Sequence, residues 1–209
     1  MHDIYICMKF IERLHIGALA LCMAFMLASC SEEADTTLTS QQKAIENYLT
    51  KSHKPALIEE YLVSESTEEQ PPFYTHWALN IFRYISTYYE EGRESWQVIE
   101  KGTTFDIRYT AYIFASSPGA MFATNVEENI EEIYGQYPDE ENVWSSEPMR
   151  ITLGETPLMS GLTTALEGCR IGDKVEVYLT YVAAYGKQHI GFVPSKSAVM
   201  WEIEIVEAK

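Results

Sequence analysis

The amino-acid sequence predicts an α+β fold, in which a sheet packs against one short helix. Three segments, 104–114, 174–181 and 199–205, alternate apolar and polar residues, which is the period of a half-buried strand. Ahead of the second segment, apolar residues recur at helical spacing: Leu158, Leu162, Ala165, Leu166 and Cys169. A helix and several strands with one apolar face each can bury a common core, which is the arrangement of an α+β domain.

The first residues have the pattern of a secretion signal. Lys9 and Arg13 precede an apolar run at 16–27, which at 12 residues is too short to span a bilayer. The run ends in Leu27-Ala28-Ser29-Cys30, which resembles the bacterial lipobox, where the cysteine becomes the acylated N-terminus. A plain signal peptide and a buried core helix are the alternative interpretations.

The lipobox resemblance implies a lipoprotein signal peptide at residues 1–29 and an acylated tether at 30–40, with lipid on Cys30. We therefore expect a protein that is lipid-anchored in the cell envelope, on the periplasmic or surface face of the outer membrane. The acidic segment Ser31-Glu32-Glu33-Ala34-Asp35 resembles the tag that sends some Bacteroidetes-type lipoproteins to the cell surface. A solvated tether explains the same acids equally well.

Residues 41–99 are interpreted as a small N-terminal helical extension. A helix is predicted at about 41–52, with Ser40 as its N-cap, and Pro55 should follow its end. Residues 78–89 are rich in β-branched and aromatic side chains, which predicts a strand in the middle of that segment.

The strand at 104–114 has one apolar face, formed by Phe105, Ile107, Tyr109, Ala111 and Ile113. An insertion follows at about 123–148, which holds eight acidic residues and no Lys or Arg. Apolar spacing over 126–134 predicts a short exposed helix within the insertion. The insertion is either an acidic lid over a pocket or a solvated surface excursion, and the second interpretation is preferred.

Composition and missing motifs exclude several functions. The chain holds 15 Lys and Arg against 31 Asp and Glu, so nucleic acid is not expected as a partner. The sequence contains no H-E-x-x-H, C-x-x-C or G-x-S-x-G motif and no acidic calcium loop, so we expect no metal, no cofactor and no hydrolase chemistry. Cys169, the one cysteine left in the mature body once the signal is cleaved and Cys30 carries lipid, is interpreted as a small buried hydrophobe.

Several motifs of the C-terminal half occur in a specific order. They are G-T-T-F-D-I-R-Y at 102–109, L-G-E-T-P-L-M-S-G-L at 153–162, A-Y-G at 184–186, V-P at 193–194 and Trp201. This order resembles the FKBP-type peptidyl-prolyl cis-trans isomerases, and the resemblance covers about residues 100–209. It implies an FKBP-like domain in that range, with a curved antiparallel β-sheet wrapped around the short α-helix.

The resemblance also implies an aromatic pocket. The catalytic positions of the family match Tyr109, Phe122, Tyr185 and Trp201, and the substrate-binding positions match Leu158, Met159, Leu162 and Val193. The phenol of Tyr185 would donate a hydrogen bond to the substrate. Two residues depart from the family pattern: Ala123 replaces an aspartate that follows the pocket phenylalanine, and Leu162 replaces a tryptophan on the pocket floor.

We therefore expect a cell-envelope FKBP-like isomerase, or rotamase, that assists protein folding by acting on proline-containing extracytoplasmic polypeptides. The barrier of about 18–20 kcal/mol to rotation of a peptide bond comes from amide resonance, so catalysis consists of binding the twisted amide better than either planar form. One alternative is a non-catalytic surface lipoprotein that keeps the fold and binds a peptide or another ligand. A structural subunit of an envelope complex is the third possibility.

Overall fold

The computed structural model describes residues 35–141 and 143–208. The strands are β1 (Ile58–Glu59), β2 (Phe73–Trp77), β3 (Ile81–Ile85), β4 (Thr104–Phe114), β5 (Pro118–Thr124), β6 (Met149–Thr152), β7 (Lys174–Leu179) and β8 (Ala198–Val206). The α-helices are α2 (Thr36–Asn47), α3 (Glu127–Gln136) and α4 (Ser160–Leu166), and shorter helical turns occupy Tyr48–Ser52, Glu60–Glu65 and Arg93–Ser95. This mixture confirms the α+β class that the sequence predicts.

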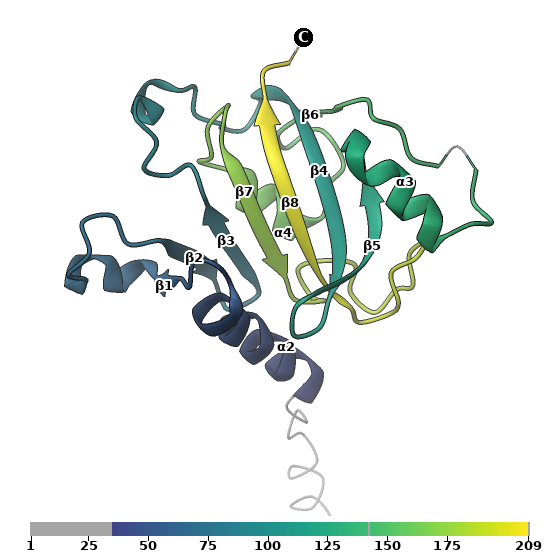
Figure 1. Cartoon of the computed structure of the whole chain (residues 1–209), viewed down its shortest axis with the longest axis horizontal. Coiled ribbons are helices and arrows are strands. Elements are labelled where there is room, and N and C mark those ends of the chain that lie inside the picture. The colour runs from purple at the N-terminus through teal and green to yellow at the C-terminus, as the bar shows by residue number, and fades with distance from the viewer. Residues whose placement is uncertain (1–34, 142, 209) are drawn as a thin grey trace, which may run out of the picture. The chain divides into compact units, whose positions relative to one another are not determined.

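The described strands form one sheet, in the order β1-β2-β3-β7-β8-β4-β5, and β6 also pairs with β4 (Figure 1). Neighbouring strands are antiparallel except for β1 and β2, which are parallel. The three strands predicted from alternation lie side by side at its centre as β7, β8 and β4. β4 has the predicted bounds, whereas β7 ends at Leu179 rather than at Tyr181.

Part of the predicted N-terminal extension belongs to this same sheet. β3 pairs with β7 along its whole length, so the expected boundary at residue 100 does not separate two structural units. The strand predicted within 78–89 is short, because Ala78 and Leu79 adopt φ values of 48° and 53° and form the turn that follows β2. β2 itself was not predicted from the sequence.

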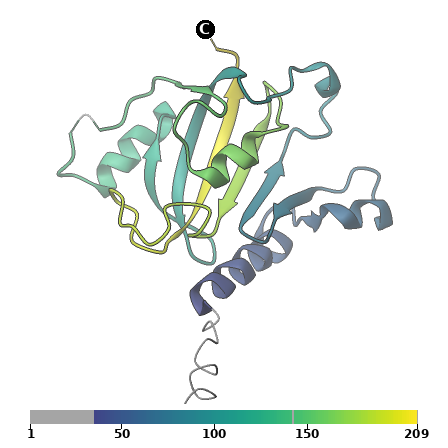
Figure 2. The same cartoon turned by 180° about the vertical axis from the view of Figure 1, so that it is seen from behind.

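Each face of the sheet has its own hydrophobic core. α4 lies across one face (Figure 2), where its Leu162 packs in the same cluster as Val177 of β7. On the opposite face Ile45 and Leu49, from α2 and the turn after it, pack in a second cluster with Tyr178. The second core was not predicted, because the alternation of β7 places Tyr178 on the face that carries polar residues. Its side chain is nevertheless 0% exposed.

α2 begins earlier than the sequence predicts. It starts at Thr36, so residues 36–40 form its first turns instead of a tether, and Ser40 lies inside the helix rather than at its N-cap. Several Ser and Thr residues precede the predicted start, and a capping rule based on residue type cannot choose among them. The helix is fixed by Gln41, whose side chain donates to the Lys196 carbonyl at 2.8 Å and accepts from the Tyr181 N–H at 2.9 Å.

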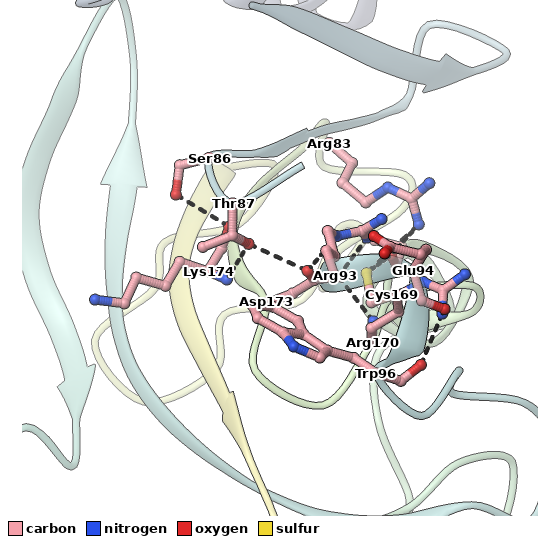
Figure 3. Close-up of polar contacts among 11 residues, drawn as sticks. Arg83, Ser86, Thr87, Arg93, Glu94, Trp96, Cys169, Arg170, Asp173 and Lys174 are labelled. Carbon is pink, nitrogen blue, oxygen red and sulfur yellow. Dashed lines mark hydrogen bonds and ion pairs between the residues drawn. The ribbon is translucent and has the colours of Figure 1, made fainter. Parts of the chain in front are cut away.

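A buried ion pair joins the segment after β3 to the start of β7 (Figure 3). Arg93 donates from Nε and Nη2 to the two carboxylate oxygens of Asp173, at 2.7 Å each. The same carboxylate accepts from the Thr87 hydroxyl at 3.1 Å and from the Arg170 N–H at 2.7 Å. Asp173 is 0% exposed, so these donors replace the water that a surface carboxylate would bind.

The C-terminal end of α4 is held by a second arginine. Nη1 of Arg83 donates to the carbonyls of Ala165 and Glu167, at 2.9 Å each. A cation at this end satisfies carbonyls that lack partners within the helix and interacts favourably with the helix dipole. Cys169 lies beside this arginine (Figure 3), and burial raises the pKa of its thiol to about 11. It is a buried free cysteine, as the sequence predicts.

The helix predicted within the insertion is present as α3. It lies beside β5 (Figure 1) and buries Ile133, which is 0% exposed, while Glu127, Glu128 and the following acids face solvent. The insertion begins two residues later than predicted, because Ala123 and Thr124 are still paired with β4 as part of β5.

The described residues include no helix that is both long and apolar enough to cross a bilayer. They also hold no cluster of His, Cys, Asp and Glu that could bind a metal ion. The expected signal peptide and the lipidation site at Cys30 lie outside the described residues.

Candidate active site

An apolar cavity of about 480 Å³ opens on the face of the sheet that carries α4. All eight pocket residues expected from the sequence line it: Tyr109, Phe122, Leu158, Met159, Leu162, Tyr185, Val193 and Trp201. They come from β4, β5, the start of α4, the loop between β7 and β8, and β8 itself. The fold therefore gathers residues that are spread over about half of the sequence.

Three aromatic rings form the side of the cavity that is built by strands. Trp201 contacts Tyr109 and Phe122, with ring centroids 5.0 Å and 5.9 Å apart. β4 and β8 are adjacent, so alternate residues of both strands project from the same face and bring Tyr109 next to Trp201. Phe122 joins them from β5, on the other side of β4.

The start of α4 approaches the loop after β7 closely, and a glycine permits this approach. The Gly161 N–H donates to the Ala183 carbonyl at 3.1 Å. A Cβ at Gly161 would lie 2.6 Å from that carbonyl oxygen and 2.8 Å from a methyl group of Leu179, which is closer than packed atoms tolerate. This contact positions the neighbouring Leu158, Met159 and Leu162 in the wall of the cavity.

Two turns in the loop between β7 and β8 present the remaining predicted residues. The Gly186 N–H donates to the Tyr181 carbonyl at 2.7 Å, and the φ of +65° at Gly186 suits glycine best. This turn directs Tyr185 to the cavity, where its ring lies 6.3 Å from that of Phe122. Further on, Ile190 and Val193 exchange backbone hydrogen bonds, and the resulting tight turn places Val193 at the cavity.

The polar groups of the cavity are few and lack partners among the described residues. Burial raises the pKa of the Tyr109 phenol, and burial together with the nearby Tyr109 raises the pKa of the Tyr185 phenol, so both remain protonated donors at neutral pH. Neither hydroxyl has a hydrogen-bond partner in the described part of the chain. The indole Nε1 of Trp201 is buried and also unpartnered among these residues.

Both departures from the family pattern lie in this cavity. Ala123 lines it beside Phe122, and none of the described lining residues is an aspartate or glutamate. Leu162, on α4, is 1% exposed and belongs to the main core. The cavity is therefore a neutral basin of aromatic and aliphatic side chains, in which hydroxyl and N–H groups are the side-chain donors.

Sequence reasoning missed the outer part of the cavity. Val143 and Trp144 come from the insertion, and Ile190 and Phe192 come from the loop between β7 and β8. Phe192 could have been found, because it directly precedes the V-P motif. Trp144 had no such signal, because only the three-dimensional course of the insertion brings it to the basin.

A second cavity, of about 330 Å³, lies beside α3 and has a different lining. It is lined mainly by charged and polar side chains, including Arg108, Lys174, Glu176, Glu202 and Glu204. Binding sites for small ligands and peptides are mostly apolar with a few polar groups placed for orientation. The aromatic basin fits that description and the charged cavity does not, so the basin is the candidate active site.

The sheet around a short helix and the aromatic basin at its side together define an isomerase-type domain of the FKBP class. A family model for the FKBP-type peptidyl-prolyl cis-trans isomerases matches residues 96–206, which is more than half of the chain. The chain belongs to this family. The match begins four residues before the boundary expected at residue 100 and includes every residue predicted for the pocket.

Comparison with solved structures gives a more distant likeness. The N-terminal domain of FKBP42 from Arabidopsis thaliana is similar over 61% of this chain and 85% of its own length, with 19% identity and a TM-score of 0.45. No curated protein sequence matches the chain.

Proposed function

We propose that this chain is a peptidyl-prolyl cis-trans isomerase or foldase of the cell envelope, which acts on extracytoplasmic polypeptides. One observation carries the catalytic part of the proposal. The eight residues that match the family's pocket surround one cavity, and two of them present phenol groups there that have no hydrogen-bond partner among the described residues. The membership of the chain in the FKBP-type family supports the same reaction.

The basin suits a mechanism that needs no acid, base or nucleophile. Amide resonance makes the planar forms of a prolyl bond charge-separated, and a dry aromatic basin stabilises those forms less than water does. The twisted amide has lost this resonance and is less polar, so the basin favours it over either planar form. In this proposal the Tyr185 hydroxyl donates to a substrate carbonyl and fixes the orientation of the peptide.

A non-catalytic binding module remains the second candidate, and the composition of the basin is the observation that favours it. Ala123 brings no carboxylate to the cavity, and Leu162 leaves its floor without an aromatic ring. Both changes leave an apolar site that can still hold a proline. They remove groups that the family resemblance associates with catalysis.

A protease-free assay of a short X-Pro peptide separates the two candidates. Uncatalysed isomerisation takes tens to hundreds of seconds, so acceleration by the protein is easy to detect. Tyr185→Phe should lower the rate about two- to tenfold, the effect of one hydrogen bond. Tyr61→Phe is the matched control, because Tyr61 is 65% exposed and lies on a different segment from the basin. Ala123→Asp should raise the rate by restoring a carboxylate.

Binding measurements on the same proteins complete this test. Acceleration that is reduced about two- to tenfold in Tyr185→Phe and unchanged in Tyr61→Phe supports the enzyme. A proline peptide that binds and changes the tryptophan fluorescence, without acceleration by the wild type or by Ala123→Asp, supports the binding module.

The proposed envelope location rests on the sequence around Cys30. A single acyl chain binds membranes only marginally, whereas two or more chains anchor a protein stably, so a multiply acylated cysteine should keep the chain in the membrane fraction. Mass spectrometry of the mature N-terminus should find lipid on Cys30. Cys30→Ala should leave the precursor uncleaved or release the protein. An unmodified N-terminus downstream of Cys30 would contradict this location.

A further inference from the structure

The loop between β7 and β8, here called the basin loop, carries Tyr185 and Val193 to the basin but contains no helix or strand. It runs over residues 180–197, and its middle, residues 187–191, is exposed. A segment with few buried side chains opens locally at a low cost in free energy. Two side chains of the candidate active site therefore depend on contacts that hold this loop in one conformation.

Four hydrogen bonds form a closed ring at the base of the basin loop. The Tyr181 carbonyl accepts from the Gly186 N–H at 2.7 Å, and the Gly186 carbonyl accepts from the Lys196 N–H at 3.1 Å. Gln41 closes the ring, because its Nε2 donates to the Lys196 carbonyl at 2.8 Å and its Oε1 accepts from the Tyr181 N–H at 2.9 Å. Three members of the ring belong to the basin loop, and Gln41 comes from α2.

The ring joins both ends of the basin loop and reaches the residue next to Tyr185. Tyr181 lies near the start of the loop and Lys196 near its end, so a single side chain of α2 holds both ends. An amide suits this position, because it presents an acceptor and two donors within one group. Gly186 directly follows Tyr185, so the ring fixes the backbone beside the phenol that is proposed to orient the substrate.

Lys196 depends on the ring for its backbone conformation. Its φ is +57°, in the left-handed region, which residues with a side chain adopt rarely and at a cost in free energy. Such a conformation persists where surrounding contacts hold it. The hydrogen bonds of Lys196 to Gly186 and to Gln41 lie on either side of this residue and are contacts of that kind.

The support for Gln41 comes from the opposite face of the sheet. α2 lies at the end of the sheet where β7 ends and β8 begins (Figure 1), and its Ile45 is fully buried in the second core. The neighbouring Gln42 donates to Oδ1 of Asn80 at 3.3 Å, in the turn between β2 and β3. The packing of α2 therefore sets the position of Gln41 independently of the basin.

This support is supplied by the extension of the chain. The family model matches residues 96–206, a range that includes the whole basin loop but not Gln41. Three of the four groups in the ring thus belong to the matched segment, and the fourth belongs to a helix that precedes it. The extension contacts the segment that presents Tyr185, although it supplies no residue to the lining of the basin.

We infer that Gln41 is a positioning residue of the basin, through which the N-terminal extension holds Tyr185 in the orientation that meets the substrate. Gln41 does not line the basin and acts through the ring of hydrogen bonds. Its effect on the reaction rests on the proposed function. Its effect on the order of the basin loop does not, and it can be measured separately.

Two neighbouring glutamines of α2 provide the test and its matched control. Gln41→Ala removes both contacts with the basin loop and keeps the helix, because alanine is the best helix former. It should lower kcat/KM for a short X-Pro peptide about two- to tenfold, the effect of one hydrogen bond, because water replaces part of the lost contacts. Gln42→Ala loosens α2 from Asn80 without touching the ring, so it should leave kcat/KM unchanged. An equal loss in both variants would overturn the inference.

A double variant tests whether Gln41 acts through Tyr185. Tyr185→Phe removes the hydroxyl that the ring is inferred to position, so Gln41→Ala should lower the rate less in this background than in the wild type. A purely structural role of Gln41 would reduce the rate by the same factor in both backgrounds. Two losses that simply multiply would therefore overturn the positioning of Tyr185.

Amide hydrogen exchange, measured by NMR, distinguishes failure of this inference from failure of the proposed function. The N–H groups of Gly186 and Lys196 should exchange faster in Gln41→Ala than in the wild type and in Gln42→Ala. If the wild type accelerates the peptide and Gln41→Ala changes neither exchange nor rate, the isomerase stands and the inference is wrong. If exchange is faster and a proline peptide binds more weakly in Gln41→Ala, while the wild type accelerates no peptide, Gln41 positions a binding site and the isomerase is wrong.

Discussion

Two parts of the molecule treat their buried polar groups in opposite ways. At the junction before β7, the Asp173 carboxylate is fully buried and receives hydrogen bonds from Arg93, Thr87 and the backbone of Arg170. In the basin, the indole Nε1–H of Trp201 is buried without a partner among the described residues, and the phenol of Tyr185 has no partner there either. At the junction the buried carboxylate is fully hydrogen-bonded by protein groups. In the basin, the side-chain donors have no acceptor among the described residues.

This difference indicates what each region is for. A buried group without a partner costs about 1–3 kcal/mol, so a chain selected only for stability would pair it or replace it with an apolar group. The junction follows that rule and holds the domain together. The basin departs from it, and so do His76 Nδ1 and Arg83 Nε, the other buried side-chain groups without a partner among the described residues. In the basin such donors agree with the proposal that a peptide binds there.

The largest expected effect is at the junction. Asp173→Ala should lower the free energy of unfolding by about 3–5 kcal/mol, because it leaves the guanidinium of Arg93, whose side chain is only 11% exposed, without its counter-charge. Urea denaturation measures this loss. Lys174→Ala is the control, since Lys174 and Glu204 form an exposed pair at 3.9 Å, and such pairs contribute about 0–1 kcal/mol. If both substitutions lowered the free energy of unfolding equally, the Asp173–Arg93 pair would stabilise the fold no more than an exposed ion pair does.

A smaller effect is expected from the unpartnered indole. Trp201→Phe keeps an aromatic ring and removes an indole N–H that has no hydrogen-bond partner in the described part of the chain. It should therefore change the free energy of unfolding by less than about 1.5 kcal/mol. Trp201→Ala should cost about 3–5 kcal/mol, because it opens a cavity in the core. The same denaturation experiment compares both variants. If the phenylalanine variant were as unstable as the alanine variant, the N–H would have a structural partner and the contrast with Asp173 would fail.

The smallest expected effect is the pH dependence of stability that His53 contributes. Burial lowers the pKa of His53, but hydrogen bonds to Glu176 and to the Pro55 carbonyl, with the charge of Glu176, more than offset this and raise it above 6.5. Its contribution to stability is therefore complete below pH 6.5 and is lost as the pH rises through the higher folded value. Unfolding measured from pH 6 to pH 8 should show this decline.

Glu176→Gln tests the assigned cause of that decline. The amide keeps a hydrogen-bonding group of similar shape and removes the charge, so the pH dependence between 6 and 8 should become flatter. A decline of unchanged size would mean that His53 is not its source.

The central strands of the sheet could be predicted from the sequence, whereas the bounds of β3 and the start of α2 could not. β4, β7 and β8 alternate because one face of each strand packs into the core that α4 also joins, and that pattern is local. The strand β3 packs on both faces, with Phe82 in one core and Ile85 in the other, so its sequence shows no alternation. The start of α2 depends on contacts such as those of Gln41 with residues far along the chain, which no local rule contains.

The candidate active site also has residues that could be predicted and residues that could not. The eight pocket residues could be named because their motifs and order match a known family, and the structure brings all of them to one cavity. Trp144 could not be named, because its position depends on the path of the insertion and on the rings of Tyr137 and Phe192. The chemical roles of the eight residues stay predictions until rates are measured.

The pairing of β3 with β7 also governs where the sheet ends. A fragment limited to the family match at 96–206 would lack β3 and leave β7 as an edge strand, with a row of free N–H and C=O groups next to an apolar face. Such an edge is a template for pairing with a second chain and promotes aggregation. In the whole chain β3 pairs with this edge of β7, and β1 becomes the edge strand of the sheet. β1 has only two residues, so it offers few backbone groups for another chain to pair with.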